Sequence, residues 1–253
     1  MTDHHHPLSQ VKAFCFDVFG TCVNWRKSIV MALDDALSTK AKQNIDLADF
    51  ANEWRQGYLD AMATLSQKSF SQADYPDLDD IHYEILEKLL TTHGLQSELD
   101  RDQKSKLNSA WHELIPWEDS TEGISSLQKS AITATLSNGT VRLLADLAKY
   151  GSLRFDIIFS GETFLSFKPN PAMYLGAARL LKLKPEEVCM VAAHDRDLLY
   201  AKKNGLKTAF IYRPGEGHAE NDISSGSPHI DVFAKDLEEL SFLYKEVQLS
   251  SKI

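Results

Sequence analysis

The stretch FCFDVFGTCVNWR, residues 14–26, places a single carboxylate, Asp17, at the end of an apolar run and follows it with a glycine turn. The run VKAFCF (11–16) has the length and the composition of a buried β-strand. A carboxylate directly after such a strand must be paired, hydrogen bonded or used, because burying an isolated charge is costly. The rest of the chain decides among these three explanations.

Four further β-rich runs alternate with helical patterns in the second half of the chain. The runs are AITATLS (131–137), FDIIFS (155–160), VCMVAA (188–193) and KTAFIY (207–212). The segments between them, VRLLADLAKY, NPAMYLGAARLLKL and RDLLYAKKNG, have helical spacing. Continuous apolar strands that alternate with helices are typical of a parallel sheet covered on both faces. The pattern therefore predicts an α/β fold with a Rossmann-like, doubly wound parallel sheet.

Residues 28–116 differ in character, since they contain almost no β-rich run and several amphipathic helical patterns. In LADFANEWRQGYLDAMATL (47–65) apolar residues recur at helical spacing, and LDDIHYEILEKLLTTHG (78–94) repeats the pattern. We therefore expect a helical cap domain of residues 28–116, inserted after the first strand. Residues 1–27 and 117–253 are expected to form the α/β core.

Composition and charge argue against several classes of partner. The 253 residues carry a net charge of −9, so no positive field attracts nucleic acid or an anionic membrane. No stretch approaches the length of a membrane span, and no signal-peptide pattern stands at the start. The three cysteines, Cys15, Cys22 and Cys189, form no C-x-x-C pair, which argues against a disulfide framework or a zinc site. We expect a cytoplasmic protein.

Polar residues follow the strands at the edge where open parallel sheets carry their chemistry. They are Asp17 after the first strand, Ser137-Asn138-Gly139-Thr140 after the second, Lys168 a short way past the third, and His194-Asp195-Arg196-Asp197 after the fourth. A nearby lysine would keep a buried Asp17 ionised, and an ionised, poorly hydrated carboxylate is a good nucleophile. Singly, Asp17 reads as a turn cap and Lys168 as a surface lysine. Their order at successive strand ends favours a catalytic site.

Four segments resemble the signatures of the haloacid dehalogenase-like hydrolases, and most closely those of the type II 2-haloacid dehalogenase branch. They are FDVFGT, LSNGT, KPNPAMY and VAAHDRDLLYAKKNGLKTAFIYRP, and a helical cap between the first two is also the family arrangement. The resemblance implies that an aspartate attacks C2 of a 2-halo acid, expels halide and forms an ester. Water then cleaves the ester to a 2-hydroxy acid, with no metal or other cofactor. It also suggests a homodimer.

The resemblance assigns the catalytic roles to four residues of this chain. Asp17 is the nucleophile, and the hydroxyl of Thr21 orients it. Lys168 stabilises Asp17, and Asp197 positions or activates the hydrolytic water. The expected reactants are therefore water and a small anionic 2-halo acid.

Six further residues are expected to bind the substrate or the halide, and two of these, Phe19 and His194, depart from the family pattern as described below. Ser137 would hold the substrate carboxylate, Asn138 would help to cradle the departing halide, and Tyr174 would hydrogen bond nearby. In the cap, EWRQGYLDAM resembles the segment whose arginine binds the anion, which puts Arg55 over the site. The simpler reading of Arg55, a solvated helix charge, is weaker because Arg55 borders an aromatic stripe.

Other positions lining the expected site depart from the family pattern. The chain reads Ala192-Ala193-His194 where dehalogenases tend to have Ser-Ser-Asn, so an amide is replaced by an imidazole that titrates near neutral pH. Position 19 is Phe where Tyr is frequent, and Arg196 stands where an aromatic residue often lines the pocket. These changes shift the expected substrate toward something larger or more polar, or abolish dehalogenation.

Two other functions stay open at this stage. A magnesium-dependent phosphatase of the same superfamily usually has an acid two residues after the nucleophile, but here that residue is Phe19. Magnesium also favours extra carboxylates in the fourth motif, where this chain has Ala192 and Ala193, although Asp195 remains. A non-catalytic relic is the third reading. The intact nucleophile, lysine, amide and arginine speak against it.

Overall fold

The computed structural model describes residues 6–216 and 227–250, and their six strands form one parallel sheet. The strand order is β3-β2-β1-β4-β5-β6, so the order reverses between β1 and β4, as in a doubly wound sheet. The strands are β1 (Ala13–Phe16), β2 (Ile132–Ser137), β3 (Ile157–Ser160), β4 (Val188–Ala192), β5 (Lys207–Ile211) and β6 (Val232–Ala234). The predicted α/β fold is confirmed. The sequence patterns did not predict β6, whose three residues are too few to show a periodicity.

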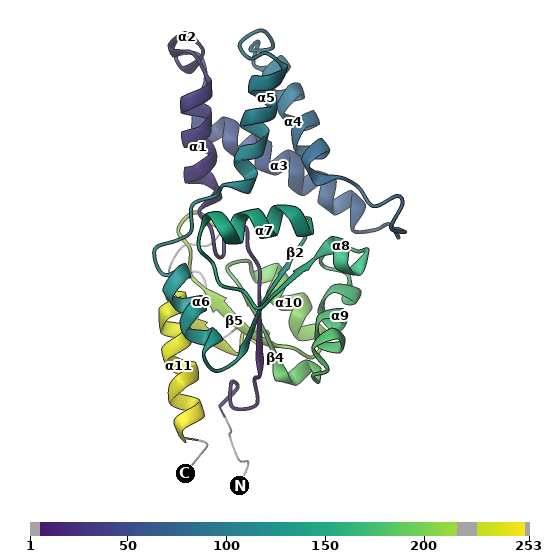
Figure 1. Cartoon of the computed structure of the whole chain (residues 1–253), viewed down its shortest axis with the longest axis vertical. Helices are drawn as coiled ribbons and strands as arrows, with labels where there is room; N and C mark the ends of the chain where they lie inside the picture. The colour runs from purple at the N-terminus through teal and green to yellow at the C-terminus, as the bar shows by residue number, and fades with distance from the viewer. Residues whose placement is uncertain (1–5, 217–226, 251–253) are drawn as a thin grey trace.

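Both faces of the sheet are covered by helices, because the buried strands carry apolar residues on both sides. In β1, Phe14 and Phe16 point to one apolar cluster, while Ala13 and Cys15 point to the other. One face holds α6 (Ser120–Gln128), α7 (Val141–Tyr150) and α11 (Leu237–Ser250), and the other holds α8 (Gly161–Phe164), α9 (Pro171–Leu181) and α10 (Asp195–Lys203). The helices α6 and α11 pack together on one side of the sheet in Figure 1.

A helical insert lies between β1 and β2 and forms the upper part of the molecule in Figure 1. It contains α1 (Trp25–Ala36), α2 (Thr39–Lys42), α3 (Leu47–Leu65), α4 (Leu78–Thr92), α5 (Arg101–Ser109) and the 3₁₀ turn η1 (Ala110–His112). A second 3₁₀ turn, η2 (Pro185–Glu187), belongs to the core and precedes β4. Since α1 begins at Trp25, the first helix overlaps residues assigned to the core by sequence. The domain division at residues 28 and 116 stays a prediction.

The two chain segments that join the insert to the core lie side by side. The backbone N–H of Asn24 donates to the carbonyl of Ile115 at 2.8 Å, and that of Trp117 donates to the carbonyl of Cys22 at 3.1 Å. These bonds fix the insert directly above the carboxyl edge of the sheet. No helix of the described residues is long and apolar enough to cross a membrane.

Candidate active site

Asp17 lies directly after the central strand β1, at the carboxyl edge of the sheet. Its backbone N–H extends the ladder to β4 by donating to the carbonyl of Val191 at 2.9 Å. The hydroxyl of the fully buried Thr21 donates to Asp17 Oδ2 at 2.9 Å and accepts from the backbone N–H of Ala193 at the same distance. Thr21 therefore fixes the carboxylate between the ends of two strands.

Lys168 joins Asp17 to a second acid. Its Nζ lies 3.2 Å from Asp17 Oδ1 and 2.5 Å from Asp197 Oδ2. The hydroxyl of Tyr174 donates to the other oxygen of Asp197 at 2.7 Å. The side-chain oxygen of Asn138 accepts from the backbone N–H of Lys168 at 2.7 Å. Asn138 thus holds in place the loop that carries the lysine.

The two acids of this network differ in the direction of their pKa shifts. Burial alone would raise the pKa of Asp17, but Lys168, His194 and Thr21 hold it well below its usual range. Burial raises the pKa of Asp197, and the attraction to Lys168 offsets this only in part. Burial also disfavours the ammonium of Lys168, yet its two carboxylate partners raise its pKa overall. Two neighbouring acids with opposite shifts are suited to different roles in one reaction.

His194 faces the second oxygen of Asp17. Its Nδ1 lies 3.0 Å from Asp17 Oδ2, and its Nε2 lies 3.0 Å from Glu216 Oε2. Burial lowers the pKa of His194, but hydrogen bonds to the two carboxylates raise it to about 9. The ring is therefore an imidazolium at neutral pH. The other oxygen of Glu216 accepts from the indole N–H of Trp25 at 2.7 Å.

Arg55, on α3 of the insert, lies among three aromatic rings. Its Cζ is 5.2 Å from the ring centre of Phe19, 5.7 Å from that of Trp25 and 5.1 Å from that of Tyr58. Its Nη1 is buried and has no hydrogen-bond partner in the described part of the chain. A buried donor without a partner is costly, so this guanidinium is suited to receive an anion.

Comparison with known proteins decides the family. The sequence model of the haloacid dehalogenase-like hydrolases matches residues 11–205. The chain belongs to this family. Within it, (S)-2-haloacid dehalogenase 4A of Burkholderia cepacia is 29% identical over 212 residues, which make up 82% of this chain and 86% of that protein.

Two solved structures place the hydrolase in the L-2-haloacid dehalogenase branch. The defluorinating L-2-haloacid dehalogenase Rha0230 is 34% identical with a TM-score of 0.83, over 93% of this chain and 95% of that one. The L-2-haloacid dehalogenase PA0810 is 36% identical with a TM-score of 0.80, over 92% and 99% of the two chains. The expected fold and the expected branch of the family are therefore both confirmed.

Two further residues singled out by sequence differ in burial, and the expected contact of Ser137 with the substrate carboxylate stays a prediction. Ser137 is buried at the end of β2, in register with Ser160 of β3. Arg196 is exposed, and its guanidinium lies 6.0 Å from the ring centre of Tyr200. This exposed guanidinium is therefore close to Tyr200, and its expected effect on the substrate stays a prediction.

Sequence reasoning missed a second group of residues that support the hydrolase site from the loop after β5. Arg213 is buried, donates from Nε to the backbone carbonyl of Thr21 at 2.9 Å, and makes a two-pronged ion pair with Asp119. Glu216 follows three residues later. The signal was available, since IYRPGEG follows the fifth strand as the other motifs follow theirs.

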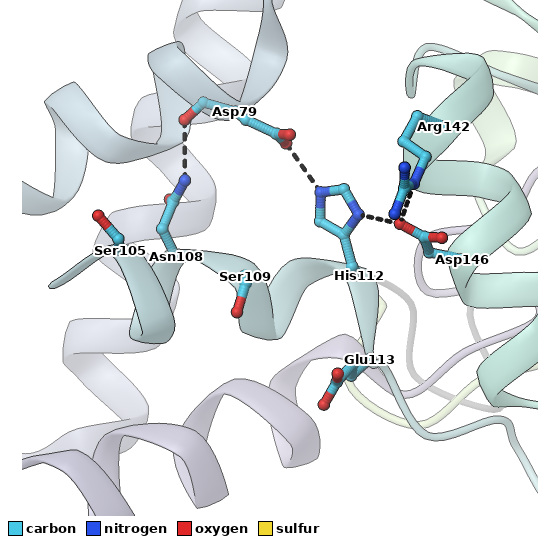
Figure 2. Close-up of a pocket in the computed structure, with 8 residues that line it drawn as sticks. All are labelled: Asp79, Ser105, Asn108, Ser109, His112, Glu113, Arg142 and Asp146. Carbon is cyan, nitrogen blue, oxygen red and sulfur yellow. Dashed lines mark hydrogen bonds and ion pairs between the residues drawn. The ribbon is translucent and has the colours of Figure 1, made fainter. Parts of the chain in front are cut away.

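A further polar cluster lies where the insert meets α7 (Figure 2). His112 bridges two acids, since its Nε2 is 3.0 Å from Asp79 of α4 and its Nδ1 is 2.9 Å from Asp146 of α7. Arg142 also pairs with Asp146 at 2.7 Å. These residues line a surface cavity of about 490 Å³. None of the predicted site residues lines it, so we treat this cluster as a contact between insert and core.

Proposed function

We propose that this protein hydrolyses short 2-haloalkanoic acids to 2-hydroxy acids through a covalent ester on Asp17. The observation that carries the proposal is the pairing of two unlike acids by Lys168. Asp17 is held ionised, while the pKa of Asp197 is raised. The unpartnered guanidinium of Arg55 adds an anion-binding group from the insert. The 29–36% identity to named 2-haloacid dehalogenases supports the substrate class.

In the first step, Oδ1 of Asp17 attacks C2 of the substrate, and the carbon–halogen electron pair leaves with the halide. Oδ1 suits this role because its hydrogen-bond partner among the described residues is Lys168 at 3.2 Å, whereas Oδ2 is engaged by both Thr21 and His194. The substrate carboxylate, the nucleophile and the leaving halide are all negative. Lys168, His194 and Arg55 offset their repulsion in a site that is largely shielded from water.

In the second step, water attacks Cγ of the Asp17 ester. Asp197 accepts the water proton, and its raised pKa makes it a better base than an ordinary aspartate. The bond from Cγ to the former Oδ1 then breaks, and the departing oxygen takes the proton back from Asp197 to give the 2-hydroxy acid. The new carboxyl of Asp17 loses the remaining water proton to solvent, because its pKa is held well below its usual range. The hydrogen bond from Tyr174 and the ion pair with Lys168 keep Asp197 in position.

The donor set around Asp17 does not fit the rival function, a magnesium-dependent phosphatase. Magnesium is bound by carboxylates and water. Here the cations Lys168 and His194 face the two oxygens of Asp17 instead. Among the residues that the structure describes, no group of three or more His, Cys, Asp or Glu side chains is placed to hold a metal ion.

Halide release from L-2-chloropropionate tests the proposal. The assay is run in the presence of EDTA with wild type and with Asp17→Asn. We expect release by the wild type and none by the variant, because an amide is not a nucleophile of this kind. A second sample, turned over once in ¹⁸O-labelled water, is expected to gain one label in the peptide that contains Asp17. Well-folded wild-type protein that releases no halide contradicts the proposal and directs attention to phosphate esters.

A further inference from the structure

The two oxygens of the Asp17 carboxylate have unlike surroundings. Oδ1 meets one cation, Lys168, which is itself held more closely by Asp197. Oδ2 meets two donors, the hydroxyl of Thr21 at 2.9 Å and the ring of His194 at 3.0 Å. If Oδ1 forms the ester, Oδ2 becomes its carbonyl oxygen. Negative charge then develops on Oδ2 when water attacks.

The contacts of His194 require both ring nitrogens to donate. Nδ1 faces Asp17 Oδ2 and Nε2 faces Glu216 Oε2, and a carboxylate oxygen can only accept. A neutral imidazole has a single N–H, so this geometry needs the imidazolium. A charged donor aimed at a developing oxyanion is worth more than a neutral one.

Glu216 is itself held in place by the core and the insert. The indole N–H of Trp25 donates to its Oε1 at 2.7 Å. Its Oε2 lies over Gly20, where a Cβ would approach it to 2.3 Å, and Gly20 has a φ of +81° that favours glycine. The turn after Asp17 therefore leaves the space that the Glu216 carboxylate occupies. The carboxylate is 11% exposed, and the His194 ring is 33% exposed.

We propose that His194 and Thr21 stabilise the oxyanion of the ester-hydrolysis step, and that Glu216 is the positioning residue that keeps His194 charged and aimed at Asp17 Oδ2. The inference rests on the proposed function, because it concerns the second half of that reaction.

The movement of electrons in ester hydrolysis shows why a variant of His194 can distinguish this step from halide expulsion. As the water oxygen bonds to Cγ, the Cγ–Oδ2 π pair moves to Oδ2, where His194 and Thr21 donate to it. Asp197 takes the water proton. The pair then returns to Cγ–Oδ2 as the Cγ–Oδ1 bond breaks. Negative charge grows on Oδ2 in this step, whereas charge leaves the Asp17 carboxylate during halide expulsion, so loss of His194 is expected to slow ester hydrolysis more than halide release.

Rapid-quench measurement of halide, with intact-protein mass spectrometry, tests the inference in His194→Ala, His194→Asn and Glu216→Gln. We expect His194→Ala to release about one halide per site in a burst and then to turn over on the order of 100-fold more slowly than wild type. The ester adduct on Asp17 should accumulate. Glu216→Gln should show the same pattern with a smaller loss, and His194→Asn should recover part of the rate.

The double variant His194→Asn/Glu216→Gln shows whether Glu216 acts through His194. If it does, Glu216→Gln slows ester hydrolysis in the wild type and has little effect once residue 194 is Asn. Glu53→Gln is the matched control, because Glu53 makes the same kind of pair, with His93 at 2.9 Å, inside the insert. We expect its burst and its steady rate to equal those of wild type.

The outcomes separate this inference from the proposed function. Wild type that releases no halide overturns both. A second outcome overturns only the inference. In it, the wild type releases halide, but His194→Ala and Glu216→Gln either accumulate no ester or slow halide release and ester hydrolysis equally. If His194→Ala does not fold, His194→Asn and Glu216→Gln give the same comparison.

Discussion

Nζ of Lys168 lies 3.2 Å from Asp17 Oδ1 and 2.5 Å from Asp197 Oδ2, so a single buried ammonium ion joins the two acids of the site. The side chains of all three residues are 13% exposed or less. Their charges are therefore poorly hydrated and depend on one another. A change in one of them alters both the chemistry and the stability of the core.

Replacement of Lys168 by Met should be costly for stability as well as activity. It leaves two buried carboxylates without their cation, and breaking such a pair typically costs about 3–5 kcal/mol. We expect urea unfolding at pH 7 to show a loss of this size, and halide release to become undetectable. Lys168→Met combined with Asp17→Asn should recover part of the stability but none of the activity. Equal stability of Lys168→Met and wild type would contradict this account.

Arg55 is expected to lower the stability of the fold while it provides an anion-binding group. Its buried Nη1 lacks a partner, so Arg55→Met should raise the free energy of unfolding by about 1 kcal/mol while abolishing turnover. Arg55→Lys should restore little activity, since an ammonium does not stack on the rings of Phe19 and Tyr58 as a guanidinium does. Added bromide should raise the melting temperature of wild type and leave that of Arg55→Met unchanged. A bromide effect of equal size in both would place the anion elsewhere.

Ester hydrolysis should fall at high pH, when His194 loses its proton. The charged groups that face the ring are Asp17 from the end of β1 and Glu216 from the loop after β5, and Lys168 contacts the other oxygen of Asp17. The carboxylates outweigh burial and raise the pKa of His194 from 6.5 to about 9. The contribution of this ring to the free energy of unfolding is therefore complete below pH 6.5 and is lost as the pH rises through about 9. The charge on the ring in the folded protein, and with it the rate of ester hydrolysis, should fall through the same upper limit of about 9. In a kcat–pH profile, Glu216→Gln should move the alkaline limb to lower pH.

His112 should stabilise the contact between insert and core in acid rather than in base. Its hydrogen bond to Asp79 raises its pKa, burial opposes the shift, and Asp146 adds to it. Because the folded pKa is raised above 6.5, the contribution is complete below that pH and is lost as the pH rises through the raised value. His112→Gln should therefore lower the melting temperature more at pH 6 than at pH 9. High salt should shrink the difference, since Asp79 and Asp146 are partly exposed.

The sheet and the residues beside Asp17 could be predicted because their positions follow from periodicity. Strands of four to six apolar residues end where the pattern ends, and parallel strands bring those ends together. Asp17, Lys168 and Asp197 are accordingly close in the structure. Arg196 shows the limit of a motif-by-motif comparison. Neighbouring residues on a helix point about 100° apart, so when Asp197 faces the lysine, Arg196 faces outward.

The position of Glu216 after the fifth strand is visible in the sequence, but its contact with His194 is not, and β6 could not be predicted at all. Glu216 belongs to a loop, whose path depends on tertiary contacts such as those with Trp25 and Gly20. The strand β6 is too short to show alternation, and its place is fixed by pairing with β5. The charge state of His194 is likewise a property of the assembled site, because it requires Asp17 and Glu216 on opposite sides of the ring.

Trp25 touches both halves of the site, since its indole N–H binds Glu216 and its ring lies 5.7 Å from the guanidinium of Arg55. Indole emission is sensitive to nearby charge, so the protein carries its own optical reporter of anion arrival at Arg55 and of the charge on the His194–Glu216 pair. The difference in fluorescence between wild type and Trp25→Phe would isolate that signal from the other three tryptophans. Stopped-flow emission could then follow the formation and decay of the ester without a label.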